Sequence, residues 1–196
     1  KLLAQLHFAE FEVLLNTHPV INFLGSSYVN VEKIGAVWFY IDFEGLAQHY
    51  GIPTRVFDFS NDLTTAAFFA VTTYDAITDT YASYIPNENS KLEDRYGVLY
   101  YYVMDSNFDT NSRPLGMSFF NRPGAQSGYA YTLSNNKDLN LDTRIKKLFF
   151  KHDGYVSNLI YNNLAKGKLL FPVDSLCGKA KEISDYDRCS KQAFDV

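Results

Sequence analysis

The chain is predicted to change from helix to extended structure within the segment Gln48-His49-Tyr50-Gly51-Ile52-Pro53-Thr54-Arg55-Val56-Phe57-Asp58-Phe59. Gly51 and Pro53 end the helix, since glycine favours a helix C-terminus and proline cannot continue one. An amide, an imidazole, a phenol, a hydroxyl, a guanidinium and a carboxylate surround this helix end, where backbone groups are also free. Functional side chains often gather at the ends of elements, so we expect a polar site here.

The helix that precedes this turn is predicted over residues 37–50. Its apolar residues are spaced by four, three and four positions and share one face: Phe39, Phe43, Leu46 and Tyr50. We expect that face to lie against the core, with the Tyr50 hydroxyl reaching the site. On the same helical wheel His49 lies at the edge of the apolar stripe and Gln48 points roughly opposite.

The rest of the chain is predicted to contain further helices and strands. Further helices are predicted over residues 2–16, 61–73 (capped by Ser60 or Asn61), 153–166 and 174–183, and the third is expected to direct Val156, Leu159, Ile160 and Leu164 inward. Strands are predicted over residues 54–59, 97–104 (a buried central strand), 128–133 and 143–150, and loops over residues 75–95 and 105–116.

This order of elements favours the α+β class, because helices precede and follow a group of strands. We expect a single domain over residues 1–183, with a central, mostly antiparallel sheet flanked by helices. Residues 184–196 are polar and are expected to form a tail.

Composition and charge exclude several classes of protein. The 196 residues are 46% hydrophobic and carry a net charge of −4, so we expect a folded globular chain without strong non-specific nucleic-acid binding. No apolar run reaches the roughly 18 residues of a membrane-spanning helix. Cys177 and Cys189 lack the spacing of a zinc or redox pair, so a reduced, cytoplasmic setting is expected, with a local disulfide as the alternative.

Several catalytic motifs are also absent from the sequence. We find no metal-ligand spacing, no P-loop, no GxSxG and no GxGxxG with an acidic partner. Metal, ATPase, serine-hydrolase and Rossmann-type sites are therefore not predicted.

Three segments of the chain resemble the FRG domain family. Leu46–Arg55, Asp58 and Ala66–Ala70 resemble its central signature, although Phe59 stands where the family usually has tryptophan. Asn121-Arg122 with Gln126–Tyr129, and then Gly167–Asp174, resemble later elements in the right order, so that the resemblance spans residues 44–180. The Phe-Arg-Gly element that names the family is missing here, and we expect it upstream of Lys1.

The resemblance implies a shared pocket for residues that are distant in sequence. The catalytic candidates are His49, Tyr50, Arg55 and Gln126, and the ligand-binding candidates are Gln48, Thr54, Asp58 and Arg122. Three alternatives stay open: Arg55 pairs with Asp58, His49 is a satisfied histidine at the core edge, and Arg122 with Gln126 belongs to a plain loop.

Three functions are compatible with these residues. The first is an enzyme acting on a phosphate-bearing or nucleotide-like ligand, in its most specific form an NAD-dependent enzyme of ADP-ribosyltransferase-like layout. There Arg55, or the arginine of the missing upstream element, would clamp the diphosphate. His49 and Tyr50 would contact the nicotinamide or ribose, and Gln126 would orient the ligand. The second is a non-catalytic sensor or binding module, since the family resembles accessory parts of bacterial proteins, some of them linked to phage defence. The third is a structural domain.

Overall fold

The computed structural model describes residues 2–87, 89–104, 111–115, 120–133 and 138–195, and it confirms the α+β class. Its helices are α1 (Leu2–Asn16), α2 (Pro19–Gly25), α3 (Phe43–His49), α4 (Leu63–Ala70), α5 (Asn121–Ala125), α6 (Gly154–Asn163), α7 (Ser175–Asp185) and α8 (Lys191–Phe194). Short 3-10 turns are η1 (Glu93–Arg95), η3 (Leu139–Leu141) and η4 (Ala165–Gly167). Its strands are β1 (Tyr28–Val31), β2 (Gly35–Trp38), β3 (Phe57–Ser60), β4 (Thr72–Asp75), β5 (Thr80–Ser83), β6 (Tyr96–Tyr102), β7 (Ser112–Pro114), β8 (Gly128–Tyr131) and β9 (Ile145–Lys151).

The described strands form several small antiparallel sheets instead of the one central sheet that was expected. Their orders are β1-β2, β3-β8-β7, β4-β5 and β6-β9. The prediction of a buried central strand over residues 97–104 was wrong, because β6 pairs with β9 alone among the described strands. One side of β6 packs near α4, while Tyr96 and Tyr101 stay exposed.

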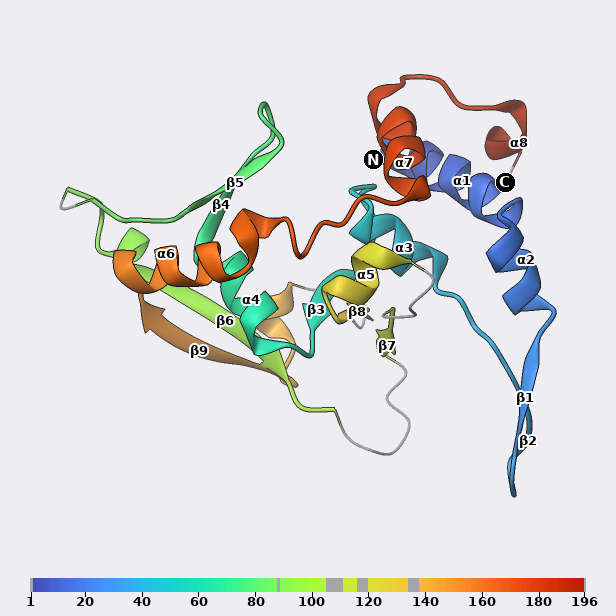
Figure 1. Ribbon diagram of the computed structural model, residues 1–196, viewed down its shortest axis with the longest axis horizontal. Helices are drawn as coiled ribbons and strands as arrows, with labels where there is room; N and C mark the ends of the chain where they lie inside the picture. Colours follow the sequence, from blue (N-terminus) through green and yellow to red (C-terminus); the bar gives the residue numbers. More distant parts are fainter. Residues whose placement is uncertain (1, 88, 105–110, 116–119, 134–137, 196) are drawn as a thin grey trace.

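Figure 1 shows how these elements are arranged. Helices α1, α7 and α8 lie together at one end, and α4, α6, β6 and β9 lie together at the other. Between them lie α3, α5, β3 and β8, and the hairpins β1-β2 and β4-β5 project outward. The segments with the candidate residues therefore occupy the middle of the molecule.

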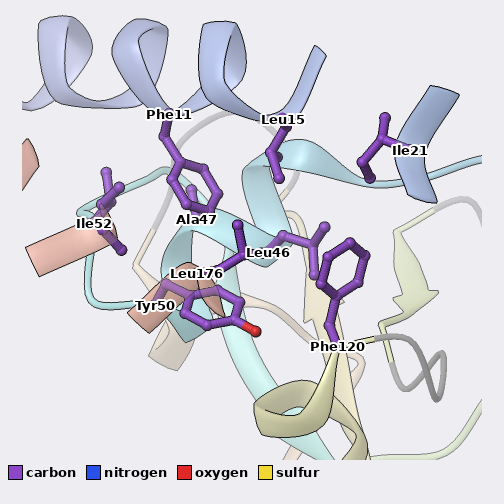
Figure 2. Close-up of a cluster of buried hydrophobic side chains, with 10 residues drawn as sticks. Phe11, Leu15, Ile21, Leu46, Ala47, Tyr50, Ile52, Phe120 and Leu176 are labelled. Atoms are coloured by element: carbon purple, nitrogen blue, oxygen red, sulfur yellow. The ribbon is translucent and has the colours of Figure 1, made fainter. Parts of the chain in front are cut away.

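The largest core cluster fixes α3 against α1 and α7 (Figure 2). Phe11 and Leu15 of α1 pack against Leu46 and Ala47 of α3. The other buried apolar residues of this cluster are Ile21, Tyr50, Ile52, Phe120, Leu176 and Ala180. Burying large apolar side chains stabilises a fold by about 1.5–3 kcal/mol each. The turn after Tyr50 therefore starts from a rigid support.

Helix α3 begins at Phe43, six residues after the predicted start, so that prediction was wrong. Asp42 accepts a hydrogen bond from the Gly45 backbone N–H at 3.0 Å and caps the helix. Upstream, a hairpin takes up residues 28–38, with Lys33 and Gly35 at positive φ in its turn. Phe39 lies outside the helix and is 38% exposed, so its helical spacing was a coincidence.

Helix α4 is shorter than the predicted 61–73. Its cap is Asp62, expected to lie in the first turn, and the carboxylate accepts from the backbone N–H groups of Thr64 and Thr65. The helix ends at Ala70 because Thr72–Asp75 forms strand β4. The hairpin partner β5 and the turn η1 occupy part of the predicted loop over residues 75–95. Part of the other predicted loop, residues 105–110, lies outside the described residues.

The C-terminal helices agree with the sequence in position but not in every buried face. Helix α6 directs Val156 and Leu159 outward, where they are 45% and 47% exposed, so these two inward predictions were wrong. The segment from Ser184, expected as a polar tail, contains α8, which packs along α1. There Ser190 donates to Glu10 and Ala193 is buried.

Candidate functional site

Strand pairing brings the turn after α5 next to β3. In the β3–β8 ladder Ser60 lies opposite Gly128 and Asp58 opposite Ala130. The Ser60 hydroxyl also donates to the Gln126 carbonyl oxygen at 2.7 Å. Because side chains alternate along a strand, Asp58 and Ser60 share one face of β3. These contacts place residues 126–128 beside a segment almost seventy positions earlier.

Gln126 fixes the orientation of the His49 ring. Its amide nitrogen donates to the Leu170 carbonyl oxygen at 2.9 Å, so its Oε1 faces His49 Nδ1 at 2.8 Å. This network assigns the ring hydrogen to Nδ1 and leaves Nε2 as an acceptor. The His49 side chain is only 2% exposed, and Nε2 forms no hydrogen bond within the described residues.

Asp58 lies across from this free nitrogen. Its Oδ1 is 3.7 Å from His49 Nε2, beyond the range of a hydrogen bond. Burial raises the pKa of the Asp58 carboxyl to about 7, since the described residues give it no hydrogen bond that favours the charged form. The side chain is still 39% exposed, and it lines a largely apolar cavity.

The pKa of His49 is shifted in the opposite direction. Burial lowers it most, the hydrogen bond to Gln126 opposes that change, and the charge of Arg122 lowers it further. His49 is therefore neutral at pH 7, and Nε2 keeps its lone pair. An acceptor nitrogen and a carboxyl of raised pKa form a pair suited to binding or moving a proton.

Two cavities meet at this pair. One has a volume of about 370 Å³ and is lined largely by apolar residues of α4, β3 and β6. The other has a volume of about 710 Å³ and carries more polar groups. Both are lined by His49, Asp58, Phe69 and Gln126. Ligand pockets commonly measure about 300–1,000 Å³, so either space suits a small molecule.

Arg122 forms part of the wall of the larger cavity. Its guanidinium lies between the rings of Tyr50 and Phe171, with Cζ 5.5 Å from each ring centroid. One terminal nitrogen donates weakly to the His49 carbonyl oxygen at 3.4 Å, and Nε is buried with no acceptor among the described residues. Arg122 is thus held in place while retaining a donor for another group.

The rim of the same cavity adds two lysines and a row of aromatic rings. Lys166 and Lys168 line it from an unusual turn, in which Ala165, Lys166 and Gly167 have φ of 49°, 61° and 92°. Positive φ is costly for the first two, because side chains with a Cβ rarely adopt it. Tyr81 stacks on Phe171 with ring centroids 5.0 Å apart and an interplanar angle of 17°.

The other predicted site residues have mainly structural contacts. Gln48 lines the larger cavity, and its Oε1 accepts from both the backbone N–H and the hydroxyl of Thr54, which closes the turn. Thr54 itself lines neither cavity. The buried Tyr50 donates its hydroxyl to Asp174 at 2.5 Å, so that hydroxyl is occupied.

Arg55 is exposed and lines neither of the two cavities. Its backbone N–H donates to Glu44, and its side chain forms no ion pair with Asp58. Asp58 lies beside His49 instead, so the structure brings His49, Asp58, Arg122 and Gln126 together around the larger cavity but leaves Arg55 outside it.

Sequence reasoning missed the lysines and rings of the larger cavity. Tyr81, Lys166 and Lys168 sit in segments without a polar cluster of their own, and Phe171 was noted only as part of the Gly167–Asp174 resemblance. Two lysines around a glycine before the Leu-Phe-Pro stretch were the only available signal.

Comparison with known proteins gives one match. Residues 21–78 match the family model described as the FRG domain. No curated protein and no solved structure matches the chain. The matched range includes His49 and Asp58, whereas Arg122 and Gln126 come from the later segments. No helix within the described ranges has the length and apolar character to cross a membrane, and no cluster of three metal-binding side chains occurs there.

Proposed function

The chain carries an FRG domain, matched over residues 21–78, and we propose that its larger cavity binds a small phosphate-bearing, nucleotide-like ligand. The observation that carries this proposal is the state of Arg122. Its guanidinium is fixed between two rings, and its buried Nε–H lacks an acceptor among the described residues. An unsatisfied buried donor costs about 1–3 kcal/mol, which a ligand oxygen would recover.

The charge around the cavity supports a phosphate. Arg122, Lys166 and Lys168 all line it, although the whole chain has a net charge of −4. A planar guanidinium matches the oxygens of a phosphate group, and the lysines add mobile point charges near it. Asp58 and Asp79 also line the cavity, so the three cations outnumber the two carboxyl groups among its described lining residues.

The aromatic wall supports a planar group in the ligand. Tyr81 and Phe171 are stacked on each other, and Phe69 packs edge-on to both. Aromatic rings bind nucleobases by stacking, with about 1–3 kcal/mol per base in nucleic-acid complexes. A nucleotide would satisfy both the charged and the aromatic parts of the cavity.

The more specific form of the proposal is an NAD-dependent, ADP-ribosyltransferase-like enzyme of bacterial defence. It is supported by the acceptor nitrogen of His49, which faces the cavity and is oriented by Gln126, as a general base requires. In this form Arg122 takes the diphosphate role that was first given to Arg55. The alternative is a sensor that binds the same ligand without turnover.

Calorimetric titration of the full chain tests the binding proposal. NAD, ADP-ribose and ADP are compared with adenosine, which lacks phosphate. We expect the phosphorylated ligands to bind more tightly, and Arg122→Ala to weaken them at least about tenfold. Arg55→Ala removes the same charge outside both cavities and should bind like the parent chain. Equal binding by Arg122→Ala and the parent chain would refute the proposal.

A second assay separates the enzyme from the sensor. The protein is incubated with labelled NAD and cell lysate, and transferred label is measured for the parent chain, His49→Ala and Arg55→Ala. Transfer that is lost in His49→Ala and kept in Arg55→Ala supports the enzyme. Tight NAD binding without transfer or NAD consumption supports the sensor.

A further inference from the structure

We infer that His49 and Asp58 together recognise a vicinal diol, so that the cavity selects ribosyl over deoxyribosyl ligands. This inference rests on the proposed function and specifies which part of a nucleotide lies beside the two side chains. It follows from the hydrogen-bonding capacity of each group and from the distance between them.

The Nε2 atom of His49 has no hydrogen-bond donor among the described residues. Nδ1 is bonded to Gln126, whose own amide is held by Leu170, so the ring cannot rotate without breaking its hydrogen bond to Gln126. Nε2 is buried and accepts nothing from the described residues, while His49 lines both cavities. A hydroxyl is a donor that fits a neutral imidazole nitrogen.

The Asp58 carboxylate also lacks a hydrogen-bond donor among the described residues. When ionised, a carboxylate only accepts hydrogen bonds, and the described residues supply none to Asp58. The pair thus presents two acceptors side by side. One hydroxyl has a single hydrogen and can donate to only one of them, whereas two hydroxyls on adjacent carbons can donate to both.

The distance between the acceptors fits that arrangement. Nε2 and Oδ1 are 3.7 Å apart. Hydroxyls about 2.8 Å from their acceptors can therefore sit next to each other above the pair, as they do in a cis-diol. Gly128 packs tightly against the His49 ring, since a Cβ there would lie 2.5 Å from Nε2. The hydroxyls must approach from the cavity.

The surrounding charges agree with a sugar that is attached to phosphate. Arg122 lines the same cavity as His49 and Asp58, and it donates to the backbone of His49 itself. Lys166 and Lys168 lie on the rim, and these three cations with Asp58 and Asp79 are the charged groups that line the cavity. A phosphate near Arg122 would bring the ribose that carries it toward His49.

The test compares ADP with 2′-deoxy-ADP and 3′-deoxy-ADP by calorimetric titration of the full chain at pH 8. At this pH His49 is neutral and Asp58 is largely ionised. We expect each deoxy ligand to bind the parent chain at least about tenfold more weakly than ADP. Asp58→Ala should reduce the discrimination against one of the two deoxy ligands to about threefold or less, and His49→Phe should do so for the other, because each hydroxyl donates to a different acceptor.

The control variant is Asp79→Ala, which removes a carboxylate from the same cavity without touching the pair. It should keep the full discrimination against deoxy ligands. Asp58→Leu, which has a similar size but no acceptor, is the second variant if Asp58→Ala does not fold, and it should lose the same discrimination as Asp58→Ala.

The outcomes separate the two proposals. If ADP and both deoxy ligands bind equally well and depend on Arg122, the diol inference is overturned and the proposed function stands. If none of the three binds, both are overturned. Discrimination against both deoxy ligands that stays unchanged in Asp58→Ala and in His49→Phe also overturns the inference.

Discussion

His49 and Asp58 face each other with Nε2 and Oδ1 3.7 Å apart, while the opposite ring nitrogen of His49 is bonded to Gln126. The ring is therefore oriented by one neighbour and left unsatisfied toward the other. The unpaired Nε2 can accept a hydrogen bond from a ligand. This relationship underlies the following predictions.

Gln126→Glu is expected to raise the pKa of His49. A carboxylate at this position stabilises the imidazolium, whereas the amide of Gln126 only accepts from the neutral ring. The measurement is an NMR titration of the His49 ring protons between pH 4 and 9. Gln192→Glu adds the same charge on an exposed residue of α8 and should leave the titration unchanged. An unaltered His49 titration in Gln126→Glu would contradict the assigned hydrogen bond.

Gly128→Ala is expected to displace the His49 ring and to weaken ligand binding. The new Cβ would lie 2.5 Å from Nε2 and 2.6 Å from Cε1, which the buried ring cannot tolerate without shifting. We expect a loss of about 1–3 kcal/mol in the free energy of unfolding, as for other overpacked sites. Denaturant unfolding and ligand titration measure the two effects.

Gly178→Ala is the matched control, because it lies inside α7 with no atom within 4 Å of the added Cβ. It should stabilise the chain by up to about 1 kcal/mol, through the higher helix propensity of alanine. Normal binding and stability in Gly128→Ala would show that the ring is not confined as described.

Asp58→Asn is expected to stabilise the folded chain at high pH. Folding raises the pKa of Asp58 from 3.8 to about 7, so the folded state holds the proton more tightly than the unfolded state. Its contribution to stability is complete below about pH 4 and is lost as the pH rises through 7. We compare the free energy of unfolding of Asp58→Asn with that of the parent chain. Because the Asp58 side chain is partly exposed, we expect this difference to favour the variant by only about 1–2 kcal/mol more at pH 8 than at pH 4.

Asp142→Asn should show the opposite pH dependence: it should lower the free energy of unfolding at neutral pH. Hydrogen bonds from Arg144 hold the pKa of Asp142 well below its ordinary value, so its contribution is present at neutral pH and is lost on acidification. Urea unfolding at several pH values measures both variants. A destabilised Asp58→Asn at pH 8 would indicate a structural role for that carboxylate.

Tyr50→Phe is expected to lower stability without changing ligand affinity. The hydroxyl donates to Asp174, which also caps α7, and it does not line either of the two cavities at His49 and Asp58. Removing it should cost about 1–2 kcal/mol in the free energy of unfolding. A large loss of affinity with unchanged stability would indicate that the Tyr50 hydroxyl contacts the ligand.

The sequence predicted the class of fold and most element positions, but not the sheet arrangement. The apolar run of β6 was interpreted as buried on both faces, whereas only tertiary packing decides that Tyr96 and Tyr101 face outward. The start of α3 was also misplaced, because Phe39 happens to match the helical spacing. Asp42 ahead of Glu44 was a usable cap signal, and the turn at Lys33–Gly35 was a usable hairpin signal.

The site could be predicted from residues that are close in sequence, but less well from residues of distant segments. His49 and Asp58 lie on either side of one turn, so their proximity could be expected. Arg122 and Gln126 were joined to them only through family resemblance, since the β3–β8 pairing cannot be read from local sequence. The direction of Arg55 depends on turn geometry, and its side chain is exposed outside both cavities.

The most direct measurement is the ¹⁵N NMR spectrum of the His49 ring in the full chain at pH 8, before and after addition of ADP. The account predicts a protonated Nδ1 that stays in place and an unprotonated Nε2 whose resonance shifts as it accepts a hydrogen bond from the ligand. An Nε2 resonance that does not respond to saturating ADP would contradict it, as would a ring protonated on Nε2.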